Sequence, residues 1–197
     1  MLTIEALSGA AAQPFFGDLA ALRIEVFREF PYLYEGTLEY EQHYLKSYSE
    51  HARSVVVLAR DDDTVVGAST AVPLTEHVED TMAPVLARAG LDPERIYYFG
   101  ESVLRASYRG RGIGHAFFDQ REAAARAHGF SITAFCAVDR PSDHPRRPKD
   151  YVPHDAFWTK RGYQKRADIV ATFAWRDLDE REESDKPMVF WIKELGL

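Results

Sequence analysis

The stretch Arg109-Gly110-Arg111-Gly112-Ile113-Gly114 carries the clearest chemical pattern in the sequence. Glycines at every second position let the backbone turn sharply, and they leave its N–H groups open because no Cβ stands in the way. An apolar run precedes the stretch and a helix-like segment, 112–128, follows it. The first N–H groups of a helix lack intrahelical partners and favour phosphate oxygens. The pattern therefore predicts an anion-binding turn between a strand and a helix.

The spacing of these glycines separates several kinds of phosphate loop. A dinucleotide-binding G-x-G-x-x-G fails, because counting from Gly110 or Gly112 puts His115 or Phe117 where the third glycine belongs. A Walker loop fails because no Gly-Lys-Ser/Thr follows Gly110 at the required distance. An ordinary glycine-rich turn without a ligand remains as the alternative.

Glu101 is the second candidate for chemistry. It lies in the run 96–104, which is apolar apart from Gly100, Glu101 and Ser102, so the run predicts a central, buried strand. Burial disfavours the charged form of a carboxylate, which suits a general base. The structural alternative is a buried carboxylate that only binds a backbone N–H. Strict alternation along the strand places Glu101 on the face opposite to Ser102 and Leu104.

The rest of the chain must supply the elements that position these groups. A helix is predicted from Asp18, as its N-cap, to a stop at Pro31, and another after Gly36-Thr37. The helix 112–128 connects the strands 96–104 and 132–138, and a helical crossover predicts that these two strands are parallel. The polar, proline-rich segment 140–153 is a long loop of the kind that often carries function. Hydrophobic patterning predicts strands at 2–7, 53–60, 64–74, 96–104, 132–138, 169–175 and 187–192, and further helices at 75–90 and about 154–161.

Composition narrows the class of protein. The 197 residues, 46% apolar and without a linker-like stretch, predict a single domain over 1–197. A net charge of −7 argues against duplex nucleic acid and suits a cationic partner. Cys136 is the only cysteine, so neither an intrachain disulfide nor a thiolate metal cluster is expected. Without a basic N-terminal region or a membrane-spanning apolar run, we expect a cytoplasmic protein with no membrane contact.

The order of elements, with Arg109-x-x-Gly112-x-Gly114 between a strand and a helix, resembles the GNAT superfamily of N-acetyltransferases over nearly the whole chain. The segment 157–163, Phe-Trp-Thr-Lys-Arg-Gly-Tyr, is similar to the family's aromatic-x-x-x-Gly-aromatic segment. The resemblance implies an α/β fold with a mixed, mostly antiparallel sheet, a central parallel strand pair and flanking helices. It also implies acetyl-CoA as acyl donor and no metal. The segments 75–90 and 140–153 depart from the family and lie where they could shape a substrate pocket.

The resemblance also implies where the donor binds. Backbone groups of 102–104 would hold the pantetheine arm, and 110–115 would cradle the pyrophosphate, with two arginines adding charge. The expected donor-binding residues are Ser102, Val103, Leu104, Arg109, Gly110, Arg111, Gly112, Ile113, Gly114 and His115.

Catalytic roles follow from the same resemblance. Glu101 lies nearest the expected thioester as general base, and a β-bulge like that of the family's strand would re-aim its side chain. His144, in the long loop, is the alternative base. Many family members have a tyrosine at the position of Trp158, whose indole N–H cannot supply a proton to the leaving thiolate. The expected acid is then Tyr163, with Tyr151, Tyr98 or water as alternatives. Water is among them because a thiol with a pKa near ~8.5 can take its proton from water.

The acceptor pocket is expected among Tyr32, Tyr34 and Glu35 together with the loop around Asp143-His144, since aromatic walls and carboxylates favour a cationic amine. A hydrophobic plug is the alternative role of the aromatic stretch 30–35. We expect transfer of acetyl from acetyl-CoA to the primary amine of a small molecule or amino-acid-like acceptor. A catalytically inactive CoA-binding regulatory domain is the alternative. The expected partner is a small amine, not nucleic acid, and the sequence allows a homodimer.

Overall fold

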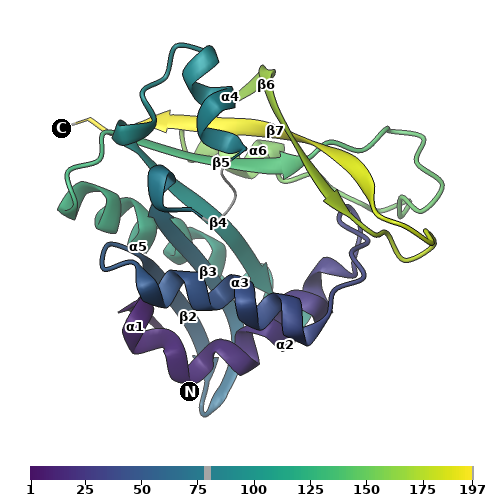
Figure 1. The fold of residues 1–197 in the computed structure, drawn as a ribbon. Helices are drawn as coiled ribbons and strands as arrows, with labels where there is room; N and C mark the ends of the chain where they lie inside the picture. Colours follow the sequence, from purple (N-terminus) through teal and green to yellow (C-terminus); the bar gives the residue numbers. More distant parts are fainter. Residues whose placement is uncertain (78–80, 197) are drawn as a thin grey trace.

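The computed structural model describes residues 1–77 and 81–196, and within them one sheet of seven strands runs through the molecule (Figure 1). The strand order is β1-β2-β3-β4-β5-β7-β6, and every neighbouring pair is antiparallel except β4 and β5. This confirms the predicted mixed, mostly antiparallel sheet with a central parallel pair. The strands are β1 (Leu2–Ser8), β2 (Val55–Asp61), β3 (Thr64–Pro73), β4 (Ile96–Leu104), β5 (Ile132–Val138), β6 (Gln164–Trp175) and β7 (Ser184–Glu194).

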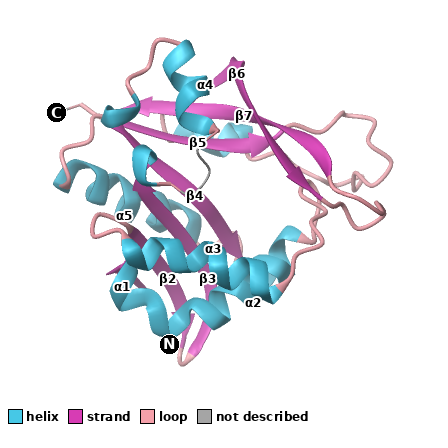
Figure 2. Cartoon of the chain, viewed as in Figure 1, coloured by secondary structure: helices cyan, strands magenta, loops and turns pink. Residues whose placement is uncertain are grey.

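Helices cover both faces of the sheet (Figures 1 and 2). The first three pack on the half built from β2 and β3, and α4 packs against the half built from β5 to β7. On the opposite face, α5 and α6 share a core with β4. No helix in the described part of the chain is long and apolar enough to cross a membrane. The helices are α1 (Gly9–Ala12), α2 (Phe16–Phe27), α3 (Leu38–Glu50), α4 (Met82–Arg88), α5 (Ile113–Ala127) and α6 (Asp155–Lys160), with 3-10 turns at Gln13–Phe15, Leu74–Glu76, Pro93–Arg95 and Ala106–Tyr108.

The parallel strands β4 and β5 separate soon after they meet. They pair only from Ile96↔Ile132 to Tyr98↔Ala134, although β4 continues to Leu104. Beyond the pairing, β4 stays bonded to β3 and β5 stays bonded to β7. The two edges that face each other there therefore keep backbone groups that no strand satisfies, which is the setting for binding an extended ligand.

A β-bulge in β4 lies at the point of separation. The β3–β4 register passes from Ser69↔Ser102 to Ala71↔Phe99, so β4 has one residue more than its partner. Gly100 permits the bulge, because an added Cβ would lie 2.2 Å from the hydroxyl oxygen of Tyr48. A bulge bends its strand and increases the local twist, and this accounts for the divergence from β5.

Two predicted helices have different limits in the structure. Asp18 is not the N-cap: α2 begins at Phe16, and Asp18 lies in its first turn, where the helix dipole also favours a carboxylate. This helix ends at Phe27, ahead of Pro31, so the predicted stop at the proline lies beyond its end. Within 75–90, of which 78–80 lie outside the described residues, Met82–Arg88 is α-helical and Thr75 and Glu76 belong to a 3-10 turn.

Candidate active site

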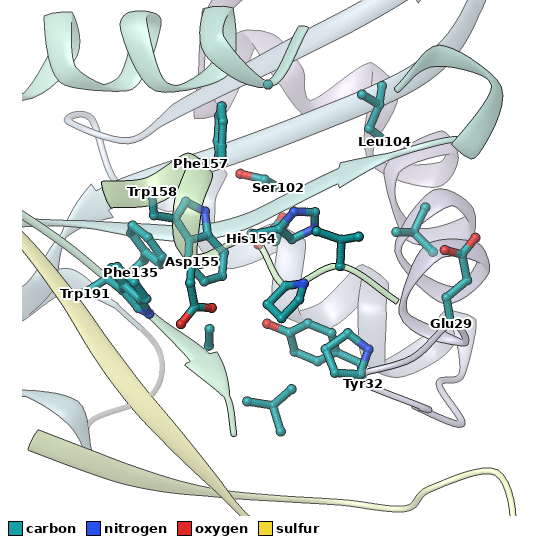
Figure 3. Close-up of a pocket in the computed structure, with 18 of the residues that line it drawn as sticks. Glu29, Tyr32, Ser102, Leu104, Phe135, His154, Asp155, Phe157, Trp158 and Trp191 are labelled. Atoms are coloured by element: carbon teal, nitrogen blue, oxygen red, sulfur yellow. The ribbon is translucent and has the colours of Figure 1, made fainter. Parts of the chain in front are cut away.

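A cavity of about 1090 Å³ opens where β4 and β5 separate (Figure 3). Three segments contribute to its lining: the glycine turn before α5, the α2–α3 connection, and the long loop between β5 and α6. Residues of β4 and the aromatic side chains of α6 and β7 complete its walls. The lining includes Glu29, Phe30, Tyr32, Gly100, Glu101, Ser102, Leu104, Arg109, Gly110, Gly112, Gly114, His115, Arg121, Arg147, Tyr151, His154, Trp158 and Trp191.

The glycine turn has the geometry of an anion cradle. Gly110 and Gly112 have φ values of 77° and 82°, in the left-handed region that favours glycine. Gly112 is the N-cap of α5 and offers no side-chain cap, so the N–H groups of the first turn keep no intrahelical partner. A Cβ at Gly110 or Gly112 would meet nothing within 4 Å, and one at Gly114 would meet only the Phe157 ring at 3.6 Å. The space beside these donors is therefore open.

The two arginines of the turn differ in position. Arg109 lines the cavity, where its Nη2 donates to Glu29 Oε2 at 2.8 Å and its Nε donates to the Leu104 carbonyl at 3.2 Å. Arg111 is absent from the lining; it donates to the Ser107 carbonyl and stacks on Tyr108. Because the pair of Arg109 with Glu29 is half exposed and hence weak, Arg109 remains able to bind a phosphate.

The expected donor-binding residues of β4 lie on alternating faces. Ser102 and Leu104 line the cavity. Val103 is fully buried in the core beneath α2, so only its backbone groups are available to a ligand. The same holds for Ile113, whose side chain is buried in the core against β4.

A buried arginine that the sequence analysis missed holds the bulge in place. Arg121 of α5 is 1% exposed, and its Nη1 donates to the carbonyls of Thr70 and Glu101 at 3.3 and 3.1 Å. Its Nη2 donates to Oγ of Ser102 at 2.8 Å, and its guanidinium lies 4.2 Å from the Phe99 ring centroid. Burial lowers the pKa of Arg121 to about 10, so it stays charged at neutral pH. Its place four residues after Phe117, on the apolar face of the helix, is the signal that could have identified it.

Glu101 is 5% exposed and belongs to a buried charge cluster under the cavity. Its Oε2 lies 2.8 Å from Arg23 Nη1 and accepts a hydrogen bond from the Tyr44 hydroxyl at 3.3 Å. Arg23 also donates to the fully buried Glu41. Burial alone would lower the pKa of Arg23, but the charges of Glu101 and Glu41 hold it well above its usual value. Glu101 Oε1 has no hydrogen-bond partner among the described residues.

The bulge affects Glu101 differently from the expectation. It turns Glu101 from the face of Phe99 onto the face of α2 and α3, where Arg23 lies. Ser102 still points to the opposite face, toward Arg121. The bulge therefore re-aims Glu101 with respect to Phe99 and leaves it opposite to Ser102.

The other expected catalytic side chains lie outside the cavity. Tyr163 is 1% exposed, its hydroxyl donates to Glu122 Oε1 at 3.3 Å and lies 3.0 Å from Thr133 Oγ1, and it is absent from the lining. Tyr98 is buried against Cys136. His144 packs its ring 5.6 Å from that of Phe30, and its Nδ1 accepts from the Arg146 backbone, also outside the lining. Of the alternative acids, the structure brings only Tyr151 to the cavity.

The expected acceptor residues are divided by the path of the chain. Tyr32 lines the cavity, whereas Tyr34 forms a β-bridge with Asp177 and Glu35 is paired with Arg28 at 3.0 Å. Leu33 takes a left-handed φ of 55° between them, which turns the following residues away. Tyr34 and Glu35 are absent from the cavity lining, whereas Tyr32 belongs to it.

The indole of Trp158 and the imidazole of His154 also line the cavity. Trp158 packs 5.0 Å from Phe135 and 5.1 Å from Trp191, ring centroid to ring centroid. His154 lies between Ser102 and Tyr32 in Figure 3. Burial and the nearby charge of Arg109 lower the pKa of His154, so its imidazole is neutral at pH 7 and can accept a proton. Within the described chain, no three His, Cys, Asp or Glu side chains are grouped to hold a metal ion.

The chain belongs to the acetyltransferase (GNAT) family, whose model matches residues 19–148. This confirms the expected superfamily and, with it, the enzyme class of an N-acetyltransferase. No curated protein matches the chain.

Solved structures share this fold over nearly their full length. An N-acetyltransferase from Staphylococcus aureus Mu50 has a TM-score of 0.62 at 11% identity, with 100% of this chain and 99% of that chain covered. The yncA protein of Salmonella typhimurium, solved with its cofactor acetyl-CoA, has a TM-score of 0.62 at 10% identity, covering 100% and 95%. A ribosomal-protein-alanine N-acetyltransferase from Brucella melitensis has a TM-score of 0.60 at 14% identity, covering 98% and 99%. Identities at this level show the shared fold.

Proposed function

We propose that this protein transfers the acetyl group of acetyl-CoA to a primary amine of a small-molecule or amino-acid-like acceptor. The observation that carries the proposal is the continuity of the cavity. It runs from an uncapped helix N-terminus, open beside its glycines, along the unpaired edge of β4 to a wall of aromatic loops. An elongated donor with a phosphate end and a second, smaller reactant suit this shape.

The residues present fit acetyl-CoA, which supplies an activated acetyl group when bound. The N–H groups of residues 113–115, with Arg109, would hold its phosphates. The free backbone groups of 102–104 would hold its extended arm as a strand partner. Ser102 supports this role, because its Oγ accepts from Arg121 and its own O–H is left to donate into the cavity.

Proton transfers fall to side chains that line the cavity. We propose Glu101, which lines the cavity, as the general base, with a water relaying the proton from the acceptor amine. His154 is the alternative base, because it is neutral and lines the same cavity. Burial raises the pKa of Tyr151, so this residue keeps a proton that it can donate to the departing thiolate.

Two measurements on the wild-type protein test the proposal. Acetyl-CoA should raise the thermal midpoint, since a ligand that binds only the folded state stabilises it. Thiol release from acetyl-CoA should then occur with members of a broad amine library. A protein that binds acetyl-CoA and acetylates no amine would instead be an inactive CoA-binding domain. A protein that does not bind acetyl-CoA would overturn the assignment of the cavity.

A further inference from the structure

Two loops that line the cavity, the α2–α3 connection and the loop 140–153, pack against each other. Arg140 joins them: its Nε donates to the Pro31 carbonyl at 2.9 Å, and its Nη2 donates to the Tyr32 carbonyl at 2.9 Å. The guanidinium is fixed in turn by Asp177, 2.8 Å away. The long loop is therefore fastened to the α2–α3 connection at its first residues.

Phe30 is the centre of the contact between these loops. Its ring lies 4.7 Å from that of Tyr151, and the guanidinium of Arg147 lies 5.8 Å from the Phe30 ring and 4.8 Å from the Tyr151 ring. Stacking on two rings orients the planar guanidinium without using its N–H donors. Both rings and Arg147 line the cavity.

Arg147 differs from the other two arginines of the loop because no residue in the described part of the chain pairs with its charge. Arg140 is paired with Asp177, and Arg146 lies 3.3 Å from Asp179. No hydrogen bond of the Arg147 side chain and no ion pair within 4.0 Å is found among the described residues. A partly buried guanidinium that is held by aromatic rings, faces a cavity and has no acidic partner is a receptor for an anion.

The carboxylates of the same cavity do not fill this role. Glu29 is paired with Arg109, Glu101 with Arg23, and Asp155 with Lys165. The two remaining carboxylates of the lining, Asp139 and Asp150, are exposed to solvent. Solvent and salt screen their charges, so these two carboxylates do not keep an anionic ligand from binding at Arg147.

We propose that Arg147 binds a carboxylate of the acceptor, so that the acceptor is an amino acid with a free carboxylate rather than a simple amine. The inference rests on the proposed acetyl transfer and deepens it by naming the acceptor class. A guanidinium binds a carboxylate through two parallel N–H···O bonds, which fixes the orientation of the acceptor as well as its charge. With the carboxylate held at the loop wall, the amine extends back toward the middle of the cavity, where β4 contributes Glu101.

The test compares the common amino acids with their α-amides, which keep the side chain and the amine but lack the negative charge. Binding is measured by calorimetry in the presence of CoA, and turnover is measured by thiol release from acetyl-CoA. The variants are Arg147→Gln, Arg147→Lys and, as a matched control, Arg146→Gln. Arg146 is adjacent, carries the same charge and is absent from the cavity lining.

We expect at least one amino acid to bind tenfold or more tightly than its amide. Arg147→Gln should weaken binding of the acid about ten- to hundredfold and leave the amide unchanged, the loss expected for a charge-assisted bidentate contact. The affinity of Arg147→Lys for the acid should lie between those of wild type and Arg147→Gln, because lysine keeps the charge and lacks the planar guanidinium. Arg146→Gln should keep the full preference for the acid.

Failure of the inference and failure of the proposed function give different results. Amides that bind as well as acids, an acid preference that survives Arg147→Gln, or no binding of any amino acid would each overturn the inference while acetylation of other amines still stands. Acid binding that depends on Arg147, with no thiol release from any compound, would uphold the carboxylate site and overturn the acetyltransferase assignment.

Discussion

The Arg23 guanidinium of α2 lies 2.8 Å from the Glu101 carboxylate of β4, and both groups are buried. Arg23 is shared with Glu41 of α3, so one cation joins two helices to the strand that lines the cavity. The arrangement has two consequences for Glu101. It fixes the carboxylate next to the point where β4 and β5 separate, and it makes the same carboxylate part of the packing of α2 and α3.

Glu101→Gln should therefore affect both chemistry and stability. If Glu101 accepts the proton of the acceptor amine, kcat for folded protein should fall about 10²-fold or more, and the residual rate should rise with pH as free amine becomes abundant. Loss of the charged hydrogen bond from Arg23 should lower the free energy of unfolding by about 1–3 kcal/mol, because Glu41 remains to pair with Arg23. The measurements are kcat against pH and chemical denaturation, with acetyl-CoA affinity as a control that should barely change.

His154→Gln is the companion variant for this experiment. An undiminished kcat in folded Glu101→Gln, together with a large loss in His154→Gln, would transfer the role of base to His154. Because the pKa of His154 is lowered, the acidic limb of the wild-type pH profile would then lie below the usual histidine value of about 6.5.

The glycine turn can be tested at Gly114 without disturbing its backbone. Gly112 needs a left-handed φ of 82°, so any side chain there strains the fold as well as the site. Gly114 has no such φ, and Gly114→Val should fold while its side chain occupies the open space beside the helix N-terminus. We expect the thermal shift by acetyl-CoA to be lost.

Gly17→Val is the matched control for Gly114→Val. Gly17 is the second residue of α2 as Gly114 is the second residue of α5, and a Cβ at Gly17 would meet nothing within 4 Å. Both substitutions change helix propensity by the same amount, but only Gly114→Val changes the cavity. An acetyl-CoA shift that persists in Gly114→Val would contradict the phosphate-binding role of the turn.

The elements that local sequence determines were predicted closely. The strand at 96–104 and the helix after it have the predicted limits within one residue, because an apolar run between Pro93 and a glycine turn leaves few alternatives. The hairpin at 53–74 and the Thr37 start of α3 follow equally local signals, and Thr37 indeed accepts from the Tyr40 N–H. Glycine spacing likewise located the uncapped helix N-terminus.

Features that depend on distant parts of the chain were not predictable in the same way. The partner of Glu101 is Arg23, far away in sequence, and its direction depends on a bulge defined by pairing with β3. Tyr163 was expected at the cavity because of its motif, but its ring is packed beneath the sheet between β5 and α5. Arg147 gave no sequence signal, since its significance lies in having no ion-pair partner among the residues that the structure describes.

His77 gives a prediction for the dependence of stability on pH. Burial lowers its pKa to about 3, with Arg23 and His51 acting in the same direction, whereas an unfolded histidine titrates near 6.5. Between these pH values the unfolded state binds a proton that the folded state does not. The contribution of His77 to the free energy of unfolding is therefore fully present above pH 6.5 and is lost as pH falls toward 3. Wild type should lose up to about 1.4 kcal/mol per pH unit more than His77→Gln between pH 6 and 4.

Chemical denaturation at several pH values measures this difference. His43→Gln, which removes an exposed histidine from α3, should follow the wild-type curve. Parallel curves for wild type and His77→Gln would show that His77 is protonated in the folded protein and that its burial has no such effect.

Protonation of the departing thiolate can be tested by comparing Tyr151, which lines the cavity, with Tyr163, which is buried outside it. Tyr151→Phe keeps the ring that packs on Phe30 and removes the proton, so kcat should fall about tenfold or more near pH 7. The deficit should shrink as pH rises past the thiol pKa of about 8.5, where the thiolate leaves without a proton. Tyr163→Phe should instead lower the free energy of unfolding by about 1 kcal/mol through its lost contacts with Thr133 and Glu122, with kcat per folded molecule unchanged. A fall in kcat for Tyr163→Phe with none for Tyr151→Phe would reverse the assignment, and equal wild-type rates in both variants would leave water as the proton source.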